Sequence, residues 1–293
     1  MNPRFISMII PSRWFTGGRG LDEFRLKMLN DRRLCKIVDY PDSKDCFAGV
    51  DISGGVDYFL WDSTYDGDCE FVSKHNGKNI VCNRKLNEFP IFPRYNEAIS
   101  ILHKVLRFKE KMLAETVSRQ TPFGFVTTYK GEEKPFKGAV TLITSRGINY
   151  VERASVSSNT DIIDKYKVIF SKATCEHAGT PDKNGQFRVI SSNRIILPGE
   201  VCTQSYLVAN SFGTEEEAQN FLTYLRSKFF RFLLLQGLTS QDISRDKFLF
   251  VPQQDFSKPW TDEELYAKYG LTDDEIAFIE SMIKPMDIGG GDE

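Results

Sequence analysis

The sequence has no long apolar run. None of its 293 residues form a stretch approaching the roughly 18 apolar residues that a membrane span needs. Near the N-terminus, charge returns at Arg13, too early for the apolar core of a signal peptide. These absences predict a cytoplasmic protein without a membrane partner. A composition of 41% hydrophobic and 27% charged residues is that of an ordinary globular protein, of one large domain or two smaller ones.

The residue types that build metal and catalytic centres are few and scattered. Six cysteines include no Cys-x-x-Cys pair, which argues against a zinc site and a disulfide framework and favours reduced thiols. The three histidines lie far apart, so a hydrolase triad has little support. The carboxylates of Pro41-Asp42 and Glu132-x-Lys134, about ninety residues apart, are weak grounds for a magnesium-dependent nuclease. We predict no metal site and no catalytic residue.

The net charge of −2 hides an uneven distribution. Residues 104–146 hold nine Lys and Arg against four Asp and Glu, net +5, and residues 165–194 hold six against two, net +4. Residues 255–293 hold three against eleven, net −8. The basic middle is consistent with binding to a polyanion such as DNA, and its alternative interpretation is ordinary solvated surface.

The first 64 residues have the pattern of an incomplete α/β sheet. Residues 5–11 predict a buried strand, residues 21–29 a helix with a broad apolar face, and residues 34–40 a second strand. Residues 56–61 predict a third strand that returns antiparallel beside the other two. Three strands and one helix leave a sheet edge unpaired, so we expect the end of a larger doubly wound domain whose front is absent.

The remainder predicts a mixed α+β region. The longest expected helix covers Arg94 to Ala114. Three further helices begin at capping boxes, Thr214…Glu217, Thr261…Glu264 and Thr272…Glu275. Strands are expected at 69–72, 78–82, 166–170 and 205–209, with a hairpin formed by 139–144 and 148–151. The tail 287–293 is expected to be disordered.

Two opening stretches, "IIPSRWFTGGRGLDEFR" and "IVDYPDSKDCFAGVDISGGVDYFLW", resemble the second half of adenine-specific (N6) DNA methyltransferases. The nearest likeness is to TaqI-type enzymes of type II and type IIG restriction–modification systems. Later pieces, among them "SRQTPFGF", "LPGEVCTQSYL" and "KFLFVPQQDF", are similar to the target-recognition region of that family. The resemblance implies a remnant of a Rossmann-like methyltransferase sheet at 1–64 and a larger α+β target-recognition domain at 65–286.

The sequence departs from this family where the chemistry would be done. Family members hold S-adenosylmethionine with a glycine-rich loop and the target adenine with Asn-Pro-Pro-Tyr, and neither motif occurs here. The nearest string is Asn2-Pro3-Arg4-Phe5, and Gly17, Gly18 and Gly20 fall in a later turn. Methyl transfer needs donor and extruded base fixed in line. We therefore expect no cofactor in this chain and no activity alone, with S-adenosylmethionine belonging to the complete enzyme.

The resemblance also implies candidate residues for the target-base pocket. Phe47 matches the family's loop phenylalanine, which packs against the extruded adenine. Arg13 and Trp14 follow the first strand and are implied near the floor of that pocket. The alternatives are a loop aromatic tucked into the core for Phe47 and a structural corner with Trp14 buried.

Candidate DNA contacts lie in the basic middle. In "SRQTPFGF", Arg119 and Gln120 are residue types that read guanine and adenine edges, followed by Thr121 and Phe123. The cations expected to contact phosphates or to lie near them are Lys130, Lys134, Lys137, Arg146, Lys165, Lys167, Lys172, Arg188 and Arg194.

Together these features predict the specificity part of an adenine-N6 DNA methyltransferase, which binds double-stranded DNA sequence-specifically. Its expected protein partner is a methyltransferase N-terminal half, or another subunit, at the open sheet edge. The competing hypothesis is an assembly subunit of a restriction–modification complex with no DNA affinity of its own. Salt-dependent DNA binding separates the two.

Overall fold

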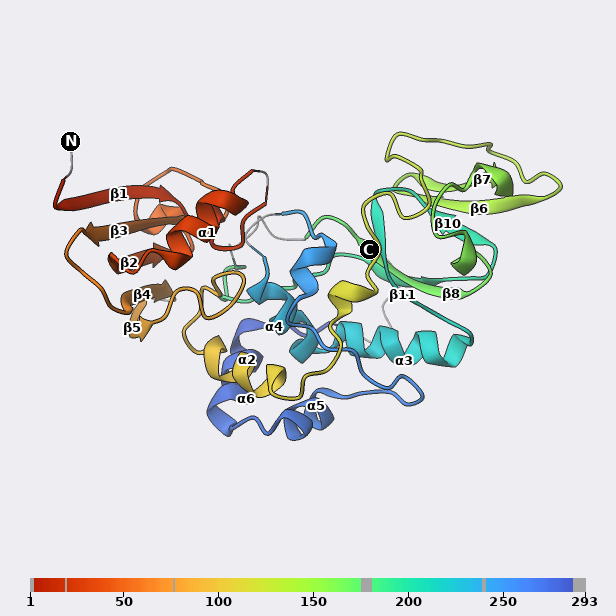
Figure 1. The fold of residues 1–293 in the computed structure, drawn as a ribbon. Helices are drawn as coiled ribbons and strands as arrows, with labels where there is room; N and C mark the ends of the chain where they lie inside the picture. Colours follow the sequence, from red (N-terminus) through yellow and green to blue (C-terminus); the bar gives the residue numbers. More distant parts are fainter. Residues whose placement is uncertain (1–2, 19, 76, 175–180, 239–240, 287–293) are drawn as a thin grey trace.

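The computed structural model describes residues 3–18, 20–75, 77–174, 181–238 and 241–286. A five-stranded sheet and two three-stranded sheets stand at opposite sides of a group of helices (Figure 1). The fold is therefore a mixed α/β arrangement with several separate sheets. Its short 3-10 helices are Ser12–Phe15, Ser43–Asp45, Leu113–Glu115, Arg153–Ser155, Thr160–Ile162 and Arg245–Phe248.

The five-stranded sheet, which we call the first sheet, confirms the expected course of the N-terminal strands. Its order is β1-β3-β2-β4-β5, and β3 lies antiparallel between β1 and β2. The boundary expected at residue 64 falls inside this sheet, because β4 and β5 extend it to Arg84 and β2 pairs with β4 in parallel. The strands are β1 Phe5–Pro11, β2 Leu34–Tyr40, β3 Val56–Asp62, β4 Cys69–His75 and β5 Lys78–Arg84.

The prediction that β1 is buried is wrong. Phe5, Met8 and Ile9 are each more than half exposed, and β1 pairs only with β3 among the described residues. The helix α1, Asp22–Asn30, likewise buries Leu29 but leaves Phe24 and Leu26 exposed. The apolar residues of β1 and α1 therefore form a strand and a helix as predicted, but the outer faces of both elements stay exposed.

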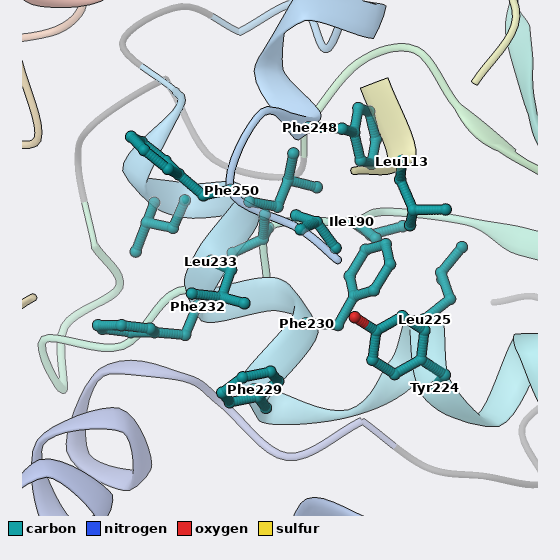
Figure 2. Close-up of a cluster of buried hydrophobic side chains, with 14 of the residues drawn as sticks. Leu113, Ile190, Tyr224, Leu225, Phe229, Phe230, Phe232, Leu233, Phe248 and Phe250 are labelled. Carbon is teal, nitrogen blue, oxygen red and sulfur yellow. The ribbon is translucent and has the colours of Figure 1, made fainter. Parts of the chain in front are cut away.

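The helices α2, α3, α4, α5 and α6 form what we call the helical body. It connects the sheets and contains the largest of the hydrophobic cores among the described residues. Its centre is α4, whose apolar residues contact neighbours all round, as a buried helix requires (Figure 2). Phe230 points toward Phe248, whereas Phe229 stacks on Tyr269 at 5.0 Å between ring centroids. All three predicted capping boxes are present, at α3, α5 and α6. The helices are α2 Ala98–Leu106, α3 Glu215–Arg226, α4 Lys228–Gln236, α5 Asp262–Tyr269 and α6 Asp273–Met282.

The helix expected from Arg94 to Ala114 is much shorter. It ends at Leu106, and Lys109 adopts a left-handed conformation with φ 54°. Beyond it, the Leu113 amide donates to the Val251 carbonyl, and Gln253 pairs with Lys111. The apolar spacing of Met112 and Leu113 therefore serves contact with a distant segment and not a continuing helix.

Two small sheets form what we call the β lobe, residues 118–212. The sheet orders are β10-β6-β7 and β11-β8-β9, and α3 packs on the second sheet. Leu142, Val151, Ile169 and Val208 belong to the core between them. The predicted hairpin and both predicted strands are confirmed, whereas β9 and β10 were missed. The strands are β6 Ala139–Thr144, β7 Gly147–Glu152, β8 Tyr166–Ser171, β9 Asn193–Ile196, β10 Glu200–Cys202 and β11 Tyr206–Phe212.

Candidate nucleic-acid interface

Strand register gathers several turns at one end of the β lobe. Parallel pairing of Cys202 with Ile143 puts residues 203–205 beside the β6–β7 turn. Antiparallel pairing of Tyr206 with Ser171 brings the end of β8 to the same place. The backbone amide of Lys172 donates to the Ser205 carbonyl, and that of Ser171 to Ser192. We call this end the rim, comprising residues 118–121, 145–146, 171–173, 188–194 and 203–206.

The "SRQTPFGF" corner is fixed to the rim by its apolar residues. Phe123 and Phe125 are buried in the core of the β lobe. Ser118 and Val208 exchange two hydrogen bonds, from the Ser118 amide to the Val208 carbonyl and from the Val208 amide to Ser118 Oγ. Thr121 has φ 57°, a strained value for a β-branched residue of the kind found at functional sites. The corner is thus anchored inside and presents polar residues outside.

Seven of the sequence-predicted DNA contacts come together at the rim. Arg119, Gln120 and Arg146 are exposed, and Lys172 is half-buried. The Arg188 guanidinium donates to the Ser191 carbonyl at 3.0 Å, and that of Arg194 lies 5.9 Å from the Tyr206 ring centroid. The full set is Arg119, Gln120, Thr121, Arg146, Lys172, Arg188 and Arg194.

Four predicted lysines lie elsewhere on the β lobe. Lys137 precedes the start of β6 and Lys165 the start of β8, at the end opposite the rim. Lys130 accepts a hydrogen bond at its carbonyl from Asn149 on β7, and Lys134 lies between there and β6. All four side chains are exposed, but the fold does not bring them to the rim.

The prediction that Lys167 and Phe123 contact DNA is wrong. Lys167 is fully buried, and its Nζ donates to the carbonyls of Ile163, Lys165 and Leu197 at 2.6 to 3.0 Å. Burial lowers its pKa to about 8. Phe123 has no exposed surface because it anchors the corner. Both side chains hold the β lobe together from inside.

A second candidate surface lies at the carboxyl ends of β1 and β2. Arg13 follows β1 and is half-buried, and Phe47 lies on the loop after β2 with 38% of its surface exposed. Ser43 Oγ closes this loop, donating to the Val50 carbonyl and accepting from the Ile52 amide, both at 2.8 Å. The chain enters β3 at Gly55, where a Cβ would lie 2.2 Å from the Tyr40 carbonyl oxygen.

Trp14 does not line an open pocket, which corrects its predicted position. The side chain is 1% exposed, and its Nε1 donates to Asp57 at 3.0 Å. Beside it, Ser12 Oγ donates to Asp39 at 2.9 Å. Arg94 reaches in from the helical body, with Nε 2.8 Å from Asp39 and Nη2 donating to the Gly54 carbonyl at 2.6 Å. This buried network secures the strand ends beneath Arg13 and Phe47.

The network holds two carboxyl groups and one guanidinium. Burial raises the pKa of Asp39, and the Arg94 guanidinium opposes that rise. Burial, with the nearby Asp39 carboxylate, raises the pKa of Asp57 to about 8. At neutral pH Asp57 therefore carries the proton, while Asp39 pairs with Arg94.

The glycine turn after β1 is occupied by side chains of α1. A Cβ on Gly17 would lie 1.7 Å from Arg25 Nη1, so the cradle is filled by a side chain of α1. The Gly18 amide donates to Asp22 Oδ1 at 3.0 Å, and Arg25 donates to the Thr16 carbonyl. The backbone amide of Gly18 and the guanidinium of Arg25 thus already serve the corner itself.

The two candidate surfaces adjoin one segment of the helical body. Thr16, beside the first sheet, shares a small cavity with Gln236 and Leu238 at the end of α4. Farther along, the Ile243 amide donates to the Lys172 carbonyl at the rim. In Figure 1, β1 runs from the outer side of the first sheet toward the middle of the molecule. The segment at and after the end of α4 therefore contacts residues next to both surfaces, Thr16 on one side and Lys172 on the other.

Sequence reasoning missed the buried network and one rim residue. Nothing in the sequence distinguishes Asp39, Asp57 and Arg94 from charged residues on the surface. The one local signal is Gly54-Gly55, which precedes β3 beside them. Gln204 lies in the turn between β10 and β11, inside the matched piece "LPGEVCTQSYL", but was not singled out as a contact residue. Among the described residues, no group of three His, Cys, Asp or Glu side chains is placed to hold a metal, and no helix is long and apolar enough to cross a membrane.

Comparisons with known proteins show that the N-terminal part is similar to restriction–modification methylases. Residues 1–47 match the family model of the Eco57I restriction-modification methylase. An uncharacterized adenine-specific methylase from Mycoplasma pneumoniae is 32% identical over 79 residues. That match covers 27% of this chain and 19% of the relative, well under two thirds of its length. The chain is related to adenine-specific methylases.

Two solved structures are similar over a larger share of the chain. One is the type IIG restriction endonuclease BpuSI, at 11% identity and a TM-score of 0.32, covering 92% of this chain and 42% of that one. The other is the type IIL restriction-modification enzyme MmeI in complex with DNA, at 7% identity and a TM-score of 0.43, covering 82% and 38%.

Proposed function

We propose that this chain is the DNA-specificity part of an adenine-N6 methyltransferase of a restriction–modification system. The first sheet is the C-terminal part of the catalytic sheet, and the β lobe with the helical body is the target-recognition domain. The observation that carries the proposal is the rim, where five separate chain segments bring five cations and two amide side chains, those of Gln120 and Gln204, to one end of the β lobe. Such a set suits phosphate contacts and base-edge readout of a duplex.

Methyl transfer by this chain requires a catalytic part that carries the adenosyl-donor loop and the Asn-Pro-Pro-Tyr motif. That part adds a strand to the free edge of β1, where Met8 and Ile9 expose apolar surface. Phe47 and Arg13 then face the target base from the carboxyl ends of the first sheet. The chain by itself chooses the site and does not methylate it.

The test of DNA binding is its salt dependence, measured by fluorescence anisotropy on a mixed-sequence duplex. Five rim cations on phosphates give a slope of log Kobs against log salt of about −4.5. Replacing Arg119, Arg146 and Lys172 by Gln should reduce the slope by about 3. The matched control replaces Lys134, Lys137 and Lys165 by Gln, all exposed and outside the rim, and should leave the slope unchanged.

The competing function, an assembly subunit, is favoured by the exposed β1 edge alone. It predicts no DNA affinity even in low salt. Equal effects of the two triple variants on the salt dependence would instead indicate non-specific electrostatic attraction of DNA to the whole lobe. The rim would then no longer support the proposal.

A further inference from the structure

Two glutamines from distant parts of the chain meet at the rim. Gln204 Nε2 lies 3.4 Å from Gln120 Oε1 and donates to it, across a sequence separation of 84 residues. The backbone of the Gln204 turn is held on both sides. The Gln204 amide donates to the Phe125 carbonyl at 2.9 Å, and the Thr203 amide donates to the Ile143 carbonyl at 3.0 Å. The pair thus stands on a turn fixed to the core of the β lobe.

The hydrogen bond leaves the two side chains with different free groups. Gln204 keeps its Oε1 acceptor and one Nε2 hydrogen. When the bond to Gln120 uses the hydrogen trans to Oε1, the free hydrogen and Oε1 lie next to each other on one edge of the amide. Gln120 has used its oxygen and retains mainly donors. Adenine presents N7 as an acceptor and the N6 amino group as a donor in the major groove, which matches the free edge of Gln204.

We propose that Gln204 is a specificity-determining residue that reads an adenine, and that Gln120 is a positioning residue that fixes the orientation of the Gln204 amide. The inference rests on the proposed DNA-recognition function. It adds that the target contains an A·T pair opposite this turn, flanked by phosphates that Arg119 and Lys172 contact.

Selection of bound duplexes from a randomised DNA library tests the assignment. The full chain should enrich adenine at one position, and Gln204→Ala should lower discrimination there by roughly 5- to 100-fold, the range of one bidentate contact. Other positions should keep their preferences. Gln219→Ala is the matched control, since Gln219 is an exposed glutamine on α3 outside the rim. Thermal unfolding of each variant checks that the fold is retained.

Three further variants separate reading from positioning. Gln204→Glu leaves acceptors only and should shift the preference from adenine toward cytosine, whose N4 amino group donates. Gln120→Glu keeps the acceptor for Gln204, so adenine preference should persist while overall affinity falls through the added negative charge. Gln120→Leu removes the acceptor and should weaken the preference without moving its position.

The outcomes are distinct for the inference and for the function beneath it. Sequence-specific binding with an unchanged preference in Gln204→Ala overturns the role of Gln204 and leaves the proposed function standing. Failure of the unaltered chain to bind any duplex in low salt overturns both.

Discussion

The ammonium group of Lys167 is enclosed by three backbone carbonyl oxygens at the end of the β lobe opposite the rim. The Ile163 and Leu197 carbonyls also accept hydrogen bonds from the Gly199 and Glu200 amides, so the ammonium group adds a second donor to each and the donor for Lys165. The side chain therefore acts at the scale of one residue as a connector between β8 and the approach to β10.

Replacing Lys167 by Met tests this role. The variant keeps the length of the side chain but removes the donor that the three carbonyls share. The Ile163 and Leu197 carbonyls keep a backbone donor, so we expect a loss of about 1–2 kcal/mol in the free energy of unfolding. Urea titration measures it. The DNA affinity of the folded variant should equal that of the parent protein, and a stable variant with weakened DNA binding would contradict this assignment.

Asp57 gives the molecule a pH-dependent stability. Its folded pKa of about 8 lies above the ordinary value of 3.8 for an aspartate, so its contribution is complete below about pH 4 and is lost as pH rises toward 8. We expect Asp57→Asn, which keeps an acceptor for Trp14, to lose less stability than the parent between pH 5 and 8. The difference should approach 1.4 kcal/mol per pH unit in urea unfolding. Parallel pH profiles would show that Asp57 is ionised throughout.

At the scale of elements, local chemistry explains which parts of the fold were predictable. Thr214, Thr261 and Thr272 fix helix starts through contacts three residues away, and these starts were predicted correctly. The end of α2 was not, because a distant pairing with Val251 decides it. Short strands such as β10 have too few residues to show a period.

The same contrast applies to the candidate site. The polar corner at Arg119 and Gln120 could be recognised because an apolar anchor follows it directly in the sequence. Lys167 was assigned to the surface because its charge is visible in the sequence and its carbonyl partners are not. Gln204 meets Gln120 only through strand register, which composition and spacing do not specify.

The exposed apolar surface of β1 predicts self-association of the protein. An edge strand with exposed Met8 and Ile9 favours association with other chains. We expect Met8→Glu with Ile9→Lys to reduce concentration-dependent self-association in sedimentation velocity several-fold, with unchanged DNA affinity. Val81→Lys, on the opposite edge strand β5, is the comparison, and an equal reduction would show that β1 is not the preferred edge. A parent protein that stays monomeric at all concentrations would argue against an adhesive edge.

At the scale of the whole molecule, Arg94 joins the first sheet to the helical body. It is the guanidinium that balances Asp39 in the buried network, and it belongs to the segment leading into α2. Arg94→Met should cost roughly 3–5 kcal/mol, because Asp39 is left as a buried unpaired charge. Arg94→Met combined with Asp39→Asn should recover most of that loss. Chemical denaturation of the three proteins measures the coupling, and additive losses would contradict the pairing.

The rim is built from turns, whereas the residues that stabilise the β lobe lie in strands and on the inner side of the corner. Positions 119–120, 145–146 and 204 are therefore free to change with little loss of folding. If the rim reads DNA as proposed, exchanging these few side chains should change the recognised sequence while the strands and buried anchors that support the rim stay the same.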